Sequence, residues 1–118
     1  MQVNSTSYQP NFEAKVSKRF VDAAQKFCQK DDTGTRTMRF HKKLSDVDGF
    51  GHPASEIKFS KNRKKGSYKL ILRNEKLAPG EFLVLCNKDR FRKVVEYFSH
   101  LTDGKLKFAE KRLTGEIK

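Results

Sequence analysis

The chain has 118 residues, 36% of them hydrophobic, which is enough apolar material for one compact domain but not for two. Lysine and arginine number 26 against 14 acidic residues, and the formal charge of +12 favours a polyanionic partner such as nucleic acid or an acidic protein. No apolar run approaches the roughly 18 residues of a membrane span, and no signal-peptide core is visible, so we expect an intracellular, cytoplasmic protein without a membrane partner.

The chain divides into three expected segments. Residues 1–11 are polar and predict a flexible tail, residues 12–113 predict a single α+β domain, and residues 114–118 predict a second short tail. Apolar residues recur at helical spacing from Val16 to Cys28, and Asn11 is suited to cap the start of this helix. The turn-forming sequence DDTG then ends the helix.

A first strand is expected immediately after that turn. Residues 35–44 alternate apolar and polar side chains, which predicts a half-buried strand with Arg39 and Lys43 on its polar side. Residues 45–55 are rich in Asp and Gly and contain a proline, which predicts a loop.

The middle of the chain predicts a β-hairpin followed by another strand. Residues 56–60 and 67–73 both alternate apolar and polar side chains, on either side of a lysine-rich turn that contains Gly66. The sequence EFLVLC at residues 81–86 is apolar on both sides, which is typical of a central strand.

A second helix is expected over residues 88–103, between the N-cap candidate Asn87 and the C-cap candidate Gly104. Residues 105–118 leave two possibilities open, a further strand or a frayed basic helix. The order predicts an α+β fold, with both helices packed on one face of an antiparallel sheet of three or four strands. The other face would display basic side chains: Arg39, His41, Lys43, Lys58, Lys69 and Arg73.

The sequence contains little that enzyme chemistry requires. His41, His52 and His100 lack the spacing of metal ligands, and Cys28 and Cys86 fall in apolar patterns typical of buried, reduced thiols. The sequence DVDGFG lacks the later carboxylates of a calcium loop, and no glycine-rich phosphate-binding motif occurs. We therefore expect no enzyme, no cofactor and no metal site.

Residues 58–73 form the most distinctive segment, because seven of them are basic and none is acidic. The basic residues are Lys58, Lys61, Arg63, Lys64, Lys65, Lys69 and Arg73. Cations on a turn and its strands can follow a phosphate backbone, with a steep dependence on salt. Lysines on an edge hairpin also prevent sheets from pairing, but that role explains a few charges and not this many. The pattern therefore favours a polyanion contact surface, to which Arg39 and Lys43 are added as candidates.

Aromatic residues bear on the type of recognition. Proteins that bind single-stranded RNA often display aromatic side chains on an open sheet. Most phenylalanines here fall on core-facing positions, and Phe59 and Tyr68, which are closest to the basic segment, are expected to face inward. Recognition of backbone and shape is therefore favoured over recognition of bases.

The segments RFVDAAQKFCQK, GTRTMRFHKKL, YKLILRN, EFLVLC and DRFRKVVEYFSHL resemble, in order and spacing, the small Alu-domain subunits of the signal recognition particle. The resemblance covers residues 19–112 and implies an αβββα fold, pairing through the sheets and binding of structured RNA by a basic sheet surface and loops. By position it implies RNA contacts at Arg39, Lys43, residues 61–65, Lys69 and Arg73. The expected strand at residues 56–60 departs from the family, which has an extended loop there.

Together these features predict a non-enzymatic module that binds nucleic acid, RNA more than DNA, through a basic hairpin and sheet face. It would act within a ribonucleoprotein or as a homo- or heterodimer formed through the sheet. Three alternatives remain open: a module whose basic face binds an acidic protein, a domain whose charge only aids solubility, and an enzyme whose site follows none of these patterns.

Overall fold

The computed structural model describes residues 15–30, 33–62 and 64–116. Its elements are α1 (Lys18–Cys28), α2 (Thr35–Val47), β1 (Glu56–Asn62), β2 (Ser67–Arg73), β3 (Leu83–Lys88), α3 (Phe91–Ser99) and α4 (Asp103–Leu113). The expected α+β class with an antiparallel sheet is confirmed. The tail at residues 1–11, the cap at Asn11 and the candidate Arg63 lie outside the described residues.

The three strands form one antiparallel sheet in the order β1-β2-β3. The prediction of a central strand at residues 81–86 is wrong, because among the described residues β3 pairs only with β2, and β2 is the central strand. Apolar residues on both sides of β3 do not mean that both sides are buried, because Cys86 faces the core while the Val84 side chain is 40% exposed. On the outer side of β1, the amide of Ile57 donates to the carbonyl oxygen of Lys15 at 2.6 Å.

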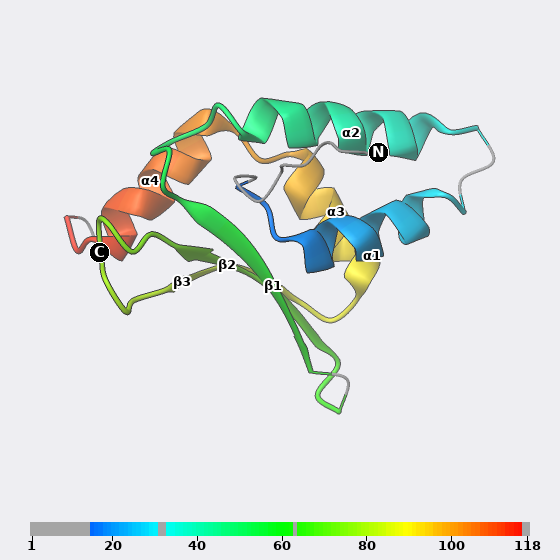
Figure 1. The fold of residues 1–118 in the computed structure, drawn as a ribbon. Coiled ribbons are helices and arrows are strands. Elements are labelled where there is room, and N and C mark those ends of the chain that lie inside the picture. The colour runs from blue at the N-terminus through cyan, green and yellow to red at the C-terminus, as the bar shows by residue number, and fades with distance from the viewer. Residues whose placement is uncertain (1–14, 31–32, 63, 117–118) are drawn as a thin grey trace, which may run out of the picture.

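The helices form two layers on one side of the sheet (Figure 1). In that view α1 and α3 lie directly above the strands, and α2 lies outermost. Helix α4 covers the end of the sheet farthest from the turn between β1 and β2. Helix α1 begins where the Ser17 hydroxyl accepts a bond from the Phe20 amide, and it buries Phe20, Ala24 and Cys28. The expected packing of the first and last predicted helices on one sheet face is therefore confirmed.

Phe20 is at the centre of the core. Its ring lies 5.2 Å from that of Phe98 and 5.7 Å from that of Phe59, measured between centroids. It also lies 6.0 Å from the rings of Phe40 and Phe91. Rings from α1, α2, α3 and β1 therefore meet in one aromatic cluster, and Leu70 and Leu72 of β2 belong to the same core.

The strand predicted at residues 35–44 is wrong, because this segment forms most of α2. Phe40, Leu44 and Val47 recur at helical spacing, and burial of Phe40 against Phe20 and Phe98 favours the helix. Met38, which the strand pattern placed inside, is 73% exposed. Arg39 and Lys43 consequently lie on a helix and not on the open sheet face.

The C-terminal half also differs from expectation. Asn87 belongs to β3, and α3 starts after Arg90, so Asn87 is not its cap. Gly104 does not end a helix but lies in the first turn of α4, which the Thr102 hydroxyl caps by accepting from the Lys105 amide at 3.1 Å. The ambiguous segment after residue 105 is thus a helix. Among the residues described, no helix is both long and apolar enough to cross a membrane.

Candidate nucleic-acid interface

The β1–β2 hairpin projects past the helices at the lower right of Figure 1. Its strands remain paired as far as Asn62 and Ser67, and the chain turns through Gly66 at a φ of 59°. The Asn62 side chain accepts a bond from the Lys65 amide at 3.3 Å, which helps to order the turn. Six predicted site residues lie on the described part of this hairpin, five lysines and one arginine: Lys58, Lys61, Lys64, Lys65, Lys69 and Arg73.

These five lysines, which we name the hairpin lysines, lack acidic partners. Within residues 15–30, 33–62 and 64–116, none of them forms an ion pair shorter than 4.0 Å. All but the half-buried Lys69 are exposed. Arg73 differs, because its guanidinium lies 3.1 Å from the Glu75 carboxylate and Glu56 is its cross-strand partner. The uncompensated charge is therefore concentrated at the projecting half of the hairpin.

The hairpin lysines lie on both sides of the sheet. Lys58 and Lys69 point away from the helices, on the side that also carries Ile71 and Val84. Lys61 is two residues beyond the buried Phe59, so it belongs to the helix-facing side. The open sheet face is therefore mixed in character, with apolar and acidic side chains among the predicted cations.

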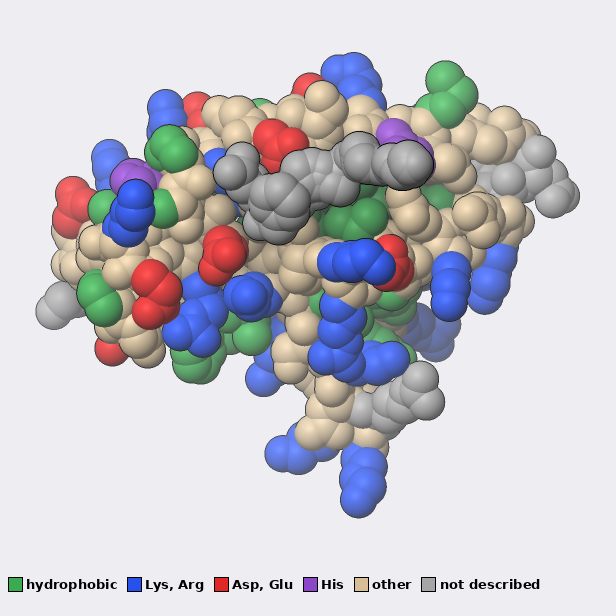
Figure 2. Space-filling view, viewed as in Figure 1, with side chains coloured by type: hydrophobic (Ala, Val, Ile, Leu, Met, Phe, Trp, Pro, Cys, Tyr) green, Lys and Arg blue, Asp and Glu red, His purple; other side chains and the backbone are tan. Residues whose placement is uncertain are grey.

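A groove of about 640 Å³ separates α1 from the helix-facing side of the hairpin. Its cations are Arg19 and Lys26 from α1, Lys30 from the turn just after α1, and Lys61 from β1. Its aromatic residues include Phe59, Tyr68 and Phe91. We name these seven residues the basic groove. Figure 2 shows lysine and arginine side chains gathered over α1 and the hairpin, so the groove and the hairpin lysines form one basic region.

The aromatic residues of the groove contact one another. Phe59 and Tyr68 have nearly parallel rings, 11° apart in plane and 6.5 Å apart between centroids. Phe91 lies 6.1 Å from Tyr68 at 64°, and the Arg19 guanidinium lies 5.8 Å from the centre of the Phe59 ring. Phe59 is buried as expected, whereas Tyr68 is only half-buried because α1 and α3 do not extend to the end of the hairpin.

Sequence reasoning missed the contribution of α1 to this region. Arg19 and Lys26 lie on α1, Lys30 lies in the turn that follows it, and all three line the same groove. The spacing of seven and four residues is visible in the sequence, and it predicts a shared side of a helix. The acid in the same groove, Asp22, is paired with Lys18 at 3.2 Å.

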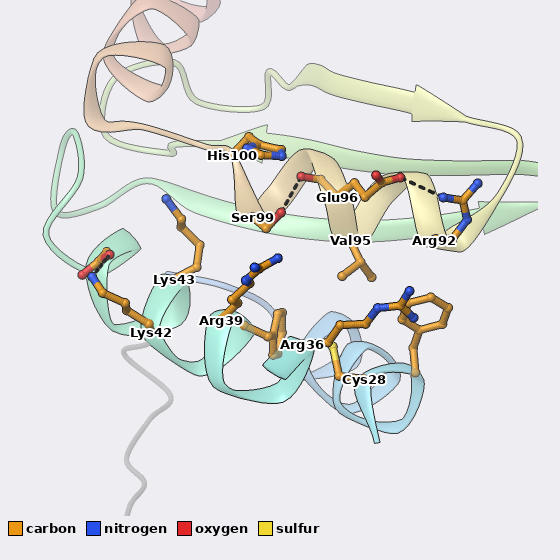
Figure 3. A pocket seen from close by; sticks show the side chains of 13 residues that line it. Cys28, Arg36, Arg39, Lys42, Lys43, Arg92, Val95, Glu96, Ser99 and His100 are labelled. Atoms are coloured by element: carbon orange, nitrogen blue, oxygen red, sulfur yellow. Dashed lines mark hydrogen bonds and ion pairs between the residues drawn. The ribbon is translucent and has the colours of Figure 1, made fainter. Parts of the chain in front are cut away.

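Arg39 and Lys43 lie in a separate cleft of about 520 Å³ between α2 and α3 (Figure 3). The Lys43 ammonium donates to the Leu101 carbonyl oxygen at 2.7 Å and lies 5.7 Å from the Phe50 ring, so it holds the fold together. Arg39 points across the cleft toward α3. The structure thus separates these two candidates from the hairpin lysines.

Acids compensate part of the charge in this cleft. Asp46 pairs with Lys42 at 3.4 Å, and Glu96 pairs with Arg92 at 3.3 Å, as the dashed line in Figure 3 marks for the second pair. The cleft is therefore a weaker candidate for a polyanion than the hairpin region.

Polar residues that resemble enzyme machinery have structural partners. The Glu110 carboxylate accepts bonds from the Ser55 hydroxyl and from the His52 amide, the latter at 2.8 Å. The Ser55 hydroxyl oxygen in turn accepts a bond from the side-chain amide of Asn74 at 3.0 Å. This buried network ties α4 to the loops before β1 and after β2. In the part of the chain that the structure describes, no group of three or more His, Cys, Asp or Glu residues is arranged to hold a metal ion.

Both cysteines are buried, and no disulfide joins them. Burial raises the pKa of the Cys86 thiol, which disfavours the reactive thiolate. This agrees with the prediction of buried, reduced thiols.

Comparison of the chain with protein families, curated proteins and solved structures finds no match. The resemblance to the small Alu-domain subunits of the signal recognition particle therefore stays a prediction. The segment that it assigns to a first strand forms α2 in this structure.

Proposed function

We propose that this protein is a non-enzymatic module that binds nucleic acid, RNA more than DNA, through the phosphate backbone. The observation that carries the proposal is the concentration of the five hairpin lysines on a projecting hairpin, without an acidic partner among the described residues. Like charges at such spacing repel one another, so the arrangement costs stability unless an anion neutralises it.

The proposal has a measurable consequence in salt. Five lysines that neutralise about five phosphates release the counterions condensed on them, which gives a slope of log affinity against log salt of about −3.5 to −4.5. Affinity should then fall about 100-fold or more between about 50 and 200 mM salt. Binding that depends on apolar contacts alone would change little over this range.

The test compares two triple variants with the same change in net charge. Lys61→Gln, Lys64→Gln and Lys65→Gln together neutralise the hairpin, and Lys76→Gln, Lys111→Gln and Arg112→Gln together neutralise exposed cations at the opposite end of the fold. Fluorescence anisotropy with a labelled RNA, in low and moderate salt, should show a loss of affinity of about 10-fold or more and a shallower slope only for the hairpin variant. Equal losses in both variants would show that net charge, and not the hairpin, attracts RNA.

The finer parts of the proposal concern setting and assembly. We place the protein on RNA inside the cell, within a ribonucleoprotein, with the open sheet face available for pairing of two copies. Purification with and without nuclease separates this proposal from the acidic-partner alternative. A partner lost after nuclease treatment is held through RNA, whereas a partner retained after it points to direct protein contact.

A further inference from the structure

We propose that the basic groove accepts an unpaired base, so that the nucleic acid bound here is single-stranded. This inference rests on the proposed function and goes beyond backbone contact. It also differs from the expectation that recognition of backbone and shape is favoured over recognition of bases.

The groove exists because the helices cover only part of the sheet. Lys61 and Tyr68 are cross-strand partners on the helix-facing side, two residues along each strand from the pair formed by Phe59 and Leu70. Phe59 and Leu70 are buried under the helices, while Lys61 is exposed and Tyr68 is half-buried. The helix-facing side of the sheet therefore continues past its cover as an open aromatic and cationic surface.

The aromatic residues suit a flat ligand. The ring of Tyr68 is nearly parallel to that of Phe59 and is supported from the side by Phe91 at 6.1 Å. These contacts restrict the rotation of Tyr68 and hold its ring in one orientation at the edge of the groove. A base can stack on such a ring irrespective of its sequence, because every base presents a π-face.

The charges suit the phosphates on either side of that base. Arg19, Lys26 and Lys30 line the α1 side, and Lys61 lines the hairpin side. A strand whose base enters between them would place its backbone next to cations on both walls. The volume of about 640 Å³ lies within the range of about 300 to 1,000 Å³ that small-ligand sites occupy, which leaves room for a base with its sugar.

A duplex does not fit this site in the same way. Its bases are already paired and stacked, so entry of one base requires its removal from the helix, which costs free energy. The groove therefore predicts a preference for single strands over duplexes of the same length and charge. Backbone contact by the hairpin lysines alone predicts no such preference, since a duplex carries more phosphate charge per unit length.

The test uses four ligands of equal length with wild-type protein: single-stranded RNA, single-stranded DNA, a duplex, and a single strand with abasic sites, which keeps its phosphates. We expect the intact single strands to bind about 10-fold more tightly than the abasic strand, as loss of one stacked base predicts. Equal affinity for intact and abasic strands, with a steep salt slope in both, would overturn the base site and leave the phosphate proposal standing. Absence of salt-dependent binding to any ligand would overturn both.

A substitution assigns the effect to the groove. Tyr68→Leu keeps an apolar side chain but removes the ring, and Tyr97→Leu is the matched control on α3, where the half-buried tyrosine lies outside the groove. We expect Tyr68→Leu to abolish the difference between intact and abasic strands, while Tyr97→Leu preserves it. Persistence of the full difference in Tyr68→Leu would overturn the proposal. Circular dichroism establishes that each variant is folded. The comparison of the four ligands uses wild-type protein, so its result does not depend on the folding of any variant.

Discussion

Lys61 of β1 and Tyr68 of β2 are directly opposed in the hairpin, on the side of the sheet that the helices cover farther along. A cation and a partly exposed aromatic ring thus share the boundary between the core and the projecting hairpin. At the next pair on the same side of the sheet, Phe59 faces Leu70, and both side chains are buried in the core. This boundary is where the fold changes from a packed sheet to the surface that we propose binds nucleic acid.

Because Lys61 lies at this boundary, removal of its charge alone tests whether the hairpin contacts RNA. Lys61→Gln should lower affinity for RNA several-fold and reduce the salt slope by about 0.7 to 0.9, the amount expected for one phosphate. Arg39→Gln removes the same charge from the cleft between α2 and α3, and we expect a smaller effect because that cleft is separate from the hairpin. Anisotropy titrations over a salt series measure both. A larger effect of Arg39→Gln would relocate the binding surface to α2 and α3.

The buried network around Glu110 should contribute to stability. Glu110→Ala leaves the Ser55 hydroxyl and the His52 amide without their acceptor, which typically costs about 1 to 3 kcal/mol for a buried polar group. Urea unfolding monitored by circular dichroism measures the loss. The control is Glu81→Ala, which removes an exposed carboxylate and should change the free energy of unfolding by less than about 0.5 kcal/mol. Equal stability of the two variants would contradict the structural role of Glu110.

Asp103 should support stability toward acid. Its carboxylate accepts a bond from the Gly51 amide at 2.8 Å and pairs with Lys107 at 3.1 Å, and these contacts lower its pKa below the ordinary 3.8. A carboxyl group with a lower pKa in the folded state stabilises the fold above its unfolded pKa, and this contribution is lost as the pH falls through the folded pKa.

Substitutions at this site should therefore act in a defined pH window. Asp103→Asn should reduce the melting temperature at pH 6 and weaken its dependence on pH below about 4. Lys107→Gln should have a smaller effect on that dependence, because the bond from Gly51 is the larger cause of the shift. Thermal melts between about pH 3 and 6 compare the three proteins. An acid response of Asp103→Asn as steep as that of the wild type would refute this role.

Local patterns allowed the hairpin and two of the four helices to be anticipated, while the pattern after residue 105 fits either a strand or a helix and tertiary contacts decided the rest. Residues 35–44 satisfy both a two-residue and a helical period, and contact of Phe40 with Phe20 and Phe98 decides between them. The edge position of β3 cannot be predicted from its apolar sequence, since strand order depends on pairing between distant segments.

The candidate site was predicted in the same partial way. A run of cations without acids is a local signal, so the hairpin lysines could be found from the sequence alone. The basic groove could not, because it depends on where α1 and α3 end relative to the strands. Lys43 shows the converse, since a cation that the pattern assigned to binding instead donates to the Leu101 carbonyl oxygen.

The two cysteines should be inert in the folded protein. Cys28 is fully buried in α1, Cys86 is 8% exposed, and the raised pKa of Cys86 further reduces its thiolate fraction. A chromogenic disulfide reagent at neutral pH should react slowly with the native protein and rapidly with two thiols after denaturation. Rapid reaction of one thiol without denaturant would show that the core around α1 or β3 opens.

The aromatic cluster around Phe20 should dominate the stability of the fold. Phe20 is fully buried and contacts rings from α2, α3 and β1, so Phe20→Ala leaves a large cavity and should cost about 3 to 5 kcal/mol. Phe108→Ala is the matched control, because the Phe108 side chain is 56% exposed on α4 and should contribute about 0.5 kcal/mol or less.

Urea unfolding of both phenylalanine variants gives the comparison, with Phe20→Leu as a milder change if Phe20→Ala does not fold. Phe20→Leu retains most of the apolar volume and should lose less stability than Phe20→Ala but more than Phe108→Ala. Because Phe59 connects this cluster to the basic groove, a loosened core should also weaken binding of single strands more than binding of duplexes. Loss of stability without that change in preference would show that the groove keeps its shape independently of Phe20.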